Sequence, residues 1–402
     1  MNAAAPRSIH AAQRLAVALA GYCAFINLYA PQAILPLLSN EFGVGAAEIS
    51  AIMTAGTLAV ALIAPFTGTV ADVLGRKRVI IAAMTVLAVP TIMAAMAPTL
   101  HELIFWRFVQ GLVLPPIFAV TIAYIGEEWP ADEATAGAGL YTMGASLGGF
   151  SGRFFTGVIA DWAGWRSAFL VLAAATLTGA LAVSLLLPRE KRFVRSEGLL
   201  TSARQMLRHF RNPQLVATYA VGFGVLFNFL VTFTYISFHL AAPPYVLSAS
   251  FLGAIFITYL AGSVLAPLAG WAVGRFGRRH FMIGTIGVWM IGVLLTLASP
   301  LPAILLGLTL CAGCGLMCQA VSTGYVTISA QAGRSSAVGL YVTSFYVGGS
   351  FGAALGGIAW TFGKYPACAA LVATMLVVMA IIVATAWTRT AQPAQAGPIE
   401  PP

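Results

Sequence analysis

The chain has 402 residues, of which 59% are apolar and only 8% are charged. Soluble globular proteins are about one quarter charged, so this composition excludes a soluble globular fold. The formal net charge of +9 does not indicate a nucleic-acid partner, because most of the basic residues lie in the segments between apolar runs.

Apolar runs of about 20 residues follow one another along the whole chain, and each is long enough to cross a hydrocarbon core of about 30 Å. Backbone polar groups in lipid must be satisfied within the chain, so these runs are predicted to be helices. The first run is too long for a signal-peptide core and is expected to remain as a helix. We predict twelve spans, at 13–38, 47–69, 79–97, 101–124, 136–159, 166–187, 214–238, 248–272, 280–299, 302–328, 337–360 and 366–387.

The same pattern occurs twice. The glycine-rich segment 139–157 returns 200 positions later at 339–357, and the segment 65–77 returns 202 positions later at 267–279. Two echoes at nearly one spacing predict two like halves with six spans each, which is the usual frame of a membrane carrier that rocks around a central site. The predicted organisation is a six-helix bundle over 1–187, a linker over 188–213, a second six-helix bundle over 214–388 and a disordered tail over 389–402.

Most of the 21 Lys and Arg residues fall on one set of alternating loops. The positive-inside rule then places both termini in the cytoplasm, and we expect a bacterial inner-membrane location. The basic linker 188–213 also contains apolar residues, so we expect an amphipathic helix held against anionic membrane lipids. The alternative for this linker is a solvated run of charge.

The loop between the second and third spans carries Gly68, Asp72 and Gly75, and the basic cluster 76–78 follows directly. Here the chain resembles the major facilitator superfamily, and the resemblance extends over all twelve spans. It implies a cytoplasmic gate in which Asp72 caps the N-terminal end of the eleventh span. The second copy of the loop has Gly274 in place of that carboxylate. The alternative to a gate is an ordinary basic loop on the cytoplasmic side. The gating residues so implied are Gly68, Asp72, Gly75, Arg76 and Lys77, with Gly270, Gly277, Arg278 and Arg279 in the copy.

Small residues recur every four positions in the fifth and eleventh spans, a spacing that lets helices approach closely. The fifth span resembles the antiporter signature of proton-coupled exporters in the drug and sugar efflux branch. It departs from that signature at Ala145, where the signature has a proline. The alternative is that these glycines serve helix packing alone. The residues concerned are Gly144, Gly148, Gly152, Gly348, Gly352 and Gly356.

Two arginines, Arg107 and Arg153, lie within predicted spans. A buried charge in a membrane costs at least about 2.5–3.5 kcal/mol and usually lines a cavity or meets a partner. Arg107 stands in a pattern that resembles the family's fourth-helix motif. The alternative for both residues is snorkelling or pairing with a carboxylate at the helix ends, such as Glu102.

All twelve acidic residues fall in loops or at predicted helix ends. A proton-coupled carrier normally uses an intramembrane carboxylate, so proton coupling is implied here by the resemblance alone. His101 and His239 lie at span ends and are expected to be interfacial.

The resemblance implies a cavity lined by the first, fourth, seventh and tenth spans. Amides, hydroxyls and aromatic faces in an apolar cavity suit a small amphipathic organic solute, although each polar group could instead bond between helices. Two arginines without a carboxylate favour an anionic or neutral solute. The candidate substrate-binding residues are Tyr22, Asn27, Tyr29, Gln32, Arg107, Gln110, Arg153, Asn228, Tyr235, Gln319 and Tyr325.

Other classes of function have little support in the sequence. Cys311, Cys314 and Cys318 share a helix face, but buried cysteines usually behave as small apolar residues, so we predict no metal site and no cofactor. No nucleotide-binding loop and no catalytic constellation are evident. We expect a monomeric secondary transporter that exports a small organic compound, drug-like or sugar-like, in exchange for protons. The alternatives are a carrier for uptake of a small organic anion and, from other classes, a membrane enzyme or a channel.

Overall fold

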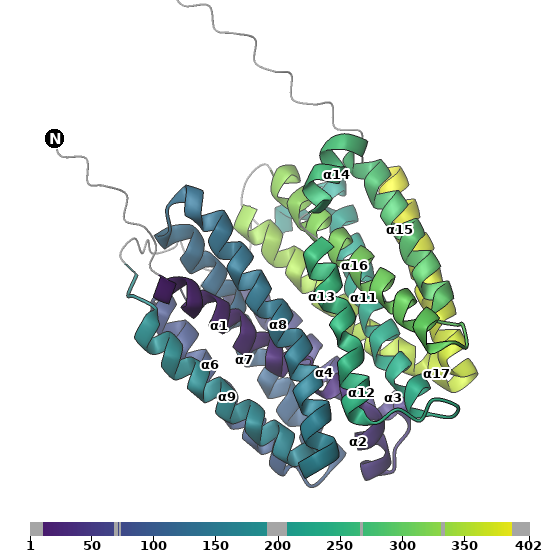
Figure 1. Cartoon of the computed structure of the whole chain (residues 1–402). Helices are drawn as coiled ribbons and strands as arrows, with labels where there is room; N and C mark the ends of the chain where they lie inside the picture. The colour runs from purple at the N-terminus through teal and green to yellow at the C-terminus, as the bar shows by residue number, and fades with distance from the viewer. Residues whose placement is uncertain are drawn as a thin grey trace, which may run out of the picture.

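A computed structural model describes residues 11–67, 71, 74–190, 207–265, 268–330 and 334–387. Within these residues the regular elements are all helices (Figure 1), and the predicted all-α membrane fold is confirmed. The tail after Trp387 and most of the predicted linker lie outside the described residues.

The N-terminal half contains six long segments, several of them interrupted. They are α1 (Ala11–Leu28) with η1 (Ala30–Ala33) and α2 (Leu35–Phe42); α3 (Ala46–Ile49) with α4 (Ala51–Ile63) and η2 (Ala64–Phe66); α6 (Arg76–Met96); α7 (Leu100–Glu128); α8 (Ala131–Ala163); and α9 (Trp165–Leu186).

The C-terminal half repeats this arrangement. Its segments are α11 (Pro213–Ala241); α12 (Ala249–Ala254) with η3 (Ile255–Ile257), α13 (Thr258–Leu265) and α14 (Leu268–Phe276); α15 (Arg278–Leu295); α16 (Leu301–Ser329); and α17 (Arg334–Ala386). The backbone of α17 leaves helical geometry at Gly363 and Lys364, so α17 holds the last two predicted spans.

Length and hydropathy alone mark eight helices in the described residues as able to cross a membrane, or nine if the bent pair in the eighth span counts as one. Splitting α17 at its break and adding α8 and α15 gives the twelve segments predicted from the sequence.

The first predicted span is not a continuous helix. It breaks between Leu28 and Leu35, where η1 carries Pro31 at its start and α2 carries Pro36 near its start. Proline lacks an N–H donor and clashes with the preceding turn, so Pro31 and Pro36 favour a break at this point. The eighth span also differs, because its two parts meet at an angle of 53°.

The two halves repeat at the level of individual contacts. The backbone of Tyr22 on α1 lies against Gly148 on α8, and the backbone of Phe223 on α11 lies against Gly348 on α17. At all four contacts of this kind a side chain on the glycine would collide with backbone atoms, so glycine allows the close approach. The other two are Ile26 against Gly152 and Phe227 against Gly352.

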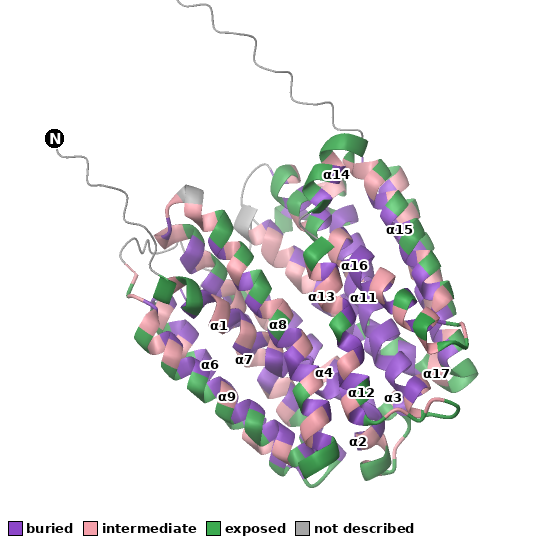
Figure 2. Ribbon diagram, in the orientation of Figure 1, coloured by how far each residue is buried: buried purple, intermediate pink, exposed green. Residues whose placement is uncertain are grey.

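The molecule has two unlike ends. We call the end that carries Arg76, Arg211 and Arg278 the basic end, and the opposite end, which carries Glu41 and Asp161, the joined end. Interactions between the halves gather toward the joined end, where α2, α3 and α12 lie together in the lower part of Figure 1. Buried residues line the faces where helices meet, and exposed residues follow the outer faces of the bundle (Figure 2).

Candidate functional site between the two halves

Arg153 of α8 occupies the interface between the halves and is only 3% exposed. Its guanidinium carbon lies 4.6 Å from the ring centroid of Tyr29 in its own half. It lies 4.4 Å from the ring of Phe256 and 5.0 Å from the ring of Tyr259, both in the C-terminal half. Cation–π attraction to three rings offsets part of the cost of burying the charge.

The hydrogen bonds of Arg153 go to neutral groups. Nε donates to Oε1 of Gln32 at 2.9 Å, and Nη1 donates to the carbonyl of Gly149 at 2.7 Å. Gln32 in turn donates to the hydroxyl of Thr234 in the other half at 2.9 Å. Among the described residues no carboxylate pairs with Arg153. The guanidinium is therefore a buried cation that joins the halves without a countercharge.

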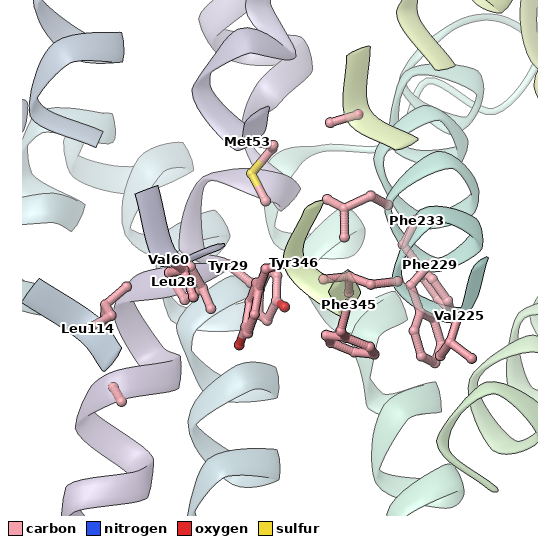
Figure 3. Packing of buried hydrophobic residues seen from close by; sticks show 14 of the residues in the cluster. Leu28, Tyr29, Met53, Val60, Leu114, Val225, Phe229, Phe233, Phe345 and Tyr346 are labelled. Carbon is pink, nitrogen blue, oxygen red and sulfur yellow. The ribbon is translucent and has the colours of Figure 1, made fainter. Parts of the chain in front are cut away.

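Aromatic side chains extend this interface toward α17. The rings of Phe118 and Tyr346, from opposite halves, stack with centroids 6.1 Å apart. The ring of Phe25 lies 6.2 Å from that of Phe118 and 6.3 Å from that of Tyr29. Figure 3 shows Tyr29 and Tyr346 side by side, and their side chains interact. The centre of the molecule thus presents an aromatic surface with one cation beside it.

A second seam joins the halves between α4 and α17. The hydroxyls of Thr57 and Ser350 are hydrogen-bonded at 2.9 Å, and both residues are buried. Farther along α17, Gly357 lies against the backbone of Ala47. This seam is held by small residues and contains no charge at these positions.

Arg107 has a different environment, inside the N-terminal half. Its side chain is 1% exposed, and it donates to the carbonyls of Asn27 at 3.1 Å and Leu28 at 2.6 Å. It also bonds to Gln110, which donates to Thr91 at 2.8 Å. These two carbonyls belong to the last residues of α1, where helical backbone bonding ends. Arg107 therefore satisfies orphan carbonyls at the break in the first span.

The remaining candidate substrate residues are distributed over both halves. The amide of Asn27 bonds to Thr176, and the hydroxyl of Tyr22 accepts from Ser151. Asn228 is fully buried and donates to the sulfur of Met379, while the hydroxyl of Tyr235 donates to the carbonyl of Ala353. The other two lie on α16, where Gln319 is half-buried and Tyr325 is buried against Trp387. Of the eleven candidates, Tyr29, Gln32 and Arg153 are brought together at the interface of the halves.

The gate residues implied by the resemblance are placed in part. Gly68 and Asp72 lie outside the described residues. Arg76 forms a bidentate pair with Glu127 at 2.6 and 3.0 Å, and the N–H of Lys77 donates to Glu190 at 3.4 Å.

The second copy of this loop shares the backbone of the first. Gly75 and Gly277 have φ angles of 90° and 77°, in the region that favours glycine, and each immediately precedes a helix. The side chains differ, because Arg278 lies 4.8 Å from the ring centroid of Tyr325 where Arg76 pairs with a carboxylate. Gly270 is exposed and Arg279 is half-buried.

Sequence reasoning missed the aromatic members of the interface, which are Phe118, Phe256, Tyr259 and Tyr346. Nothing local distinguishes them from other aromatic residues in apolar helices, because their partners belong to the other half of the chain. In the described residues no group of three His, Cys, Asp or Glu side chains is placed to hold a metal ion.

The chain matches the family model of the Major Facilitator Superfamily over residues 17–261 and 228–401. It is 32% identical over 372 residues to the inner membrane transport protein YnfM of Escherichia coli (strain K12), covering 92% of this chain and 88% of that protein. It is 27% identical to the MFS-type transporter YybF of Bacillus subtilis (strain 168), with 89% of each chain covered.

Solved structures show the same fold at low sequence identity. A mutant form of the nucleoside transporter NupG superposes with a TM-score of 0.74 at 15% identity, covering 94% of this chain and 100% of that one. A bacterial homologue of the human lysosomal transporter Spinster, in an inward-facing conformation, superposes with a TM-score of 0.71 at 14% identity, covering 94% and 96%.

Proposed function

Because the chain belongs to the major facilitator superfamily, we propose that it is a secondary transporter that carries a small organic anion with an apolar or aromatic body. The two halves rock about the interface that holds Arg153, and the substrate binds there in alternation from each side of the membrane. A location in a bacterial inner membrane agrees with the similarity to YnfM, an inner membrane transport protein.

The distribution of charge supports an orientation. Basic residues gather at the end that carries Arg76, Arg211 and Arg278, and the positive-inside rule assigns that end to the cytoplasm. The joined end then faces outward. In this orientation the structure is closed to the outside. The contacts of α8 with α12 and of α4 with α17 form the outer seal.

Arg153 is the observation that carries the proposed substrate class. In this state its charge is stabilised by Phe256 and Tyr259, which belong to the other half. When the halves separate at the joined end, the guanidinium loses its contact with both rings. Among the residues that the structure describes, no carboxylate is placed to replace them. A carboxylate or sulfonate on the substrate supplies a charge-assisted partner at that moment, and the neighbouring aromatic surface suits an apolar or aromatic body.

Export in exchange for protons is the direction we propose, because the glycine pattern of the fifth span resembles that of proton-coupled exporters. The buried residues of the described part of the chain include no Asp or Glu. Proton coupling therefore rests on that resemblance, and uptake of the same anion is the other direction to test.

The experiment separates substrate charge from substrate shape. Purified protein is screened by thermal unfolding against matched sets: benzenesulfonate and benzoate, their neutral amides, and benzylamine. A ligand that binds the folded state raises the unfolding temperature. We expect stabilisation by the anions alone, and Arg153→Gln to weaken anion binding by about 10- to 100-fold. Arg153→Lys, which keeps the charge, should retain part of the affinity.

Equal stabilisation by amides or amines, or unchanged anion binding in Arg153→Gln, would overturn the proposed substrate class. Flux of the stabilising anion into and out of proteoliposomes, with and without an imposed pH gradient, then decides direction and coupling. A flux that is insensitive to the gradient excludes proton antiport.

A further inference from the structure

One face of α8 holds the C-terminal half at three successive levels. Arg153, Gly157 and Asp161 are spaced four residues apart, so they share this face. Arg153 contacts Phe256 and Tyr259, Gly157 lies against the backbone of Ala249, and Asp161 reaches the start of α12. Asp161 is thus the outermost contact of the seam that closes over Arg153.

Asp161 binds the N-terminal end of α12 from the opposite half. Its carboxylate accepts the backbone N–H of Ala249 at 3.2 Å and of Ser250 at 2.7 Å, and the hydroxyl of Ser250 at 2.6 Å. The first N–H groups of a helix have no partner within it, and the helix dipole favours negative charge there. Ser248, which precedes α12, makes no side-chain cap of its own. The cap of α12 is therefore supplied by the other half.

The carboxyl of Asp161 is charged near neutral pH. It lies beyond the apolar segment of α8, and its partial burial acts to raise its pKa. The hydrogen bonds from Ser250, Ser248 and Ala249 outweigh that effect and bring the pKa below its ordinary value. The contact is consequently a charge-assisted one.

The seam of α17 with α3 and α4, which is the repeat counterpart of the seam of α8 with α12, lacks such an ionic cap. Gly357, the repeat counterpart of Gly157, lies against Ala47 at the start of α3. Thr361 stands 200 positions after Asp161 and donates to the carbonyl of Ile358 in its own helix at 2.7 Å. The ionic cap is therefore a property of one seam and not of the duplicated scaffold.

We propose that Asp161 is a latch that holds the joined end closed by capping α12 across the interface. Separation of the halves at this end breaks the cap and leaves both the carboxylate and the N–H groups of α12 to water. In the absence of substrate, Asp161 therefore favours the state that is open at the basic end. It acts on the substrate site only by position, since α12 leads directly into the segment that carries Phe256 and Tyr259. This proposal rests on the alternating-access cycle and not on the identity of the substrate.

The test measures the state of each end without substrate. Spin labels are placed on His101→Cys and Phe362→Cys at the joined end, which are exposed and belong to opposite halves, and in a second sample on Leu74→Cys and Phe276→Cys at the basic end. The five native cysteines are buried. Pulsed EPR in lipid nanodiscs gives the distribution of distances between the two labels at each end.

Asp161→Asn keeps the shape of the side chain and removes its charge. We expect the ratio of the separated to the closed joined end to rise about 3- to 30-fold, as the loss of charge at a helix N-terminus predicts. Ser250→Ala, which removes only the hydroxyl hydrogen bond of Ser250, should give a smaller rise. Glu41→Gln is the matched control, because Glu41 is also a carboxylate at the joined end but pairs with Arg166 of its own half at 3.0 Å.

An unchanged distance distribution in Asp161→Asn would overturn the latch. An equal shift in Glu41→Gln would also overturn it, since the effect would then be one of general surface charge. If the latch fails while anions still bind at Arg153, the proposed function stands. If anion binding fails while the distance shift is observed, the latch stands.

Discussion

At the scale of single residues, the surroundings of the two intramembrane arginines give them different roles. Arg153 contacts rings from both halves, whereas Arg107 is enclosed in one half and bonded to two carbonyls at the end of α1. A guanidinium with several donors can satisfy adjacent carbonyls, which a shorter or neutral side chain cannot do. We therefore assign Arg107 to the stability of the broken first span.

Arg107→Met is expected to lower the free energy of unfolding by about 2–4 kcal/mol, because two buried carbonyls and the amide of Gln110 lose a charged donor. Thermal unfolding in detergent measures this change, and Arg153→Gln serves as the comparison. If Arg107→Met has normal stability but no longer binds ligand, Arg107 belongs to the substrate site instead.

At the scale of helices, the seam between α8 and α12 depends on glycine at its point of closest approach. A β-carbon on Gly157 would collide with the carbonyl of Ala249, and backbone cannot move aside as a flexible side chain can. Gly253 makes the reciprocal approach to the backbone of Arg153. The distance between these two helices therefore fixes how firmly the rings of α12 and its continuation hold the guanidinium.

Gly157→Ala should force the seam apart and open the joined end, at a cost of about 1–3 kcal/mol to the closed state. The spin-label pair at the joined end reports the change. Gly139→Ala is the matched control on the same helix, because nothing lies within 4 Å of the position its β-carbon would take. A closed joined end in Gly157→Ala would mean that the seam adapts and that its tightness is not essential.

At the scale of the whole molecule, transport requires both ends to open in turn, so turnover depends on the balance between two gates. Asp161 holds the joined end in the state described here. The family resemblance implies that Asp72, which lies outside the described residues, holds the basic end closed in the opposite state. Each carboxylate belongs to the N-terminal half and would cap a helix of the C-terminal half, one at each end of the molecule.

Asp72→Asn alone is expected to lower turnover without lowering expression, because the protein then remains in the state open at the basic end. Adding Asp161→Asn should recover part of the rate, since it weakens the opposing latch. Counterflow in proteoliposomes measures both rates for the anion found in the screen. A full transport rate in Asp72→Asn would contradict a latch at Asp72. A double variant slower than Asp72→Asn would show that the two gates do not oppose each other.

The sequence by itself determined the membrane class, the twelve spans and the duplication. These follow from local properties: the length of apolar runs is set by bilayer thickness, and Gly75 and Gly277 repeat because both turns need a positive φ. The sequence did not determine the break in the first span, because Pro31 and Pro36 coincide with a break whereas Pro115 and Pro116 lie inside the continuous helix α7.

Only the tertiary structure decided which polar residues meet. Arg107 and Arg153 are the same residue type in similar apolar helices, yet one bonds to carbonyls at a helix end and the other joins the two halves. Asp161 belongs to no motif and acquires its partner from a helix that begins 88 residues later. Contacts of this kind depend on how two bundles dock, and docking is set by close packing over many helices and by no local pattern.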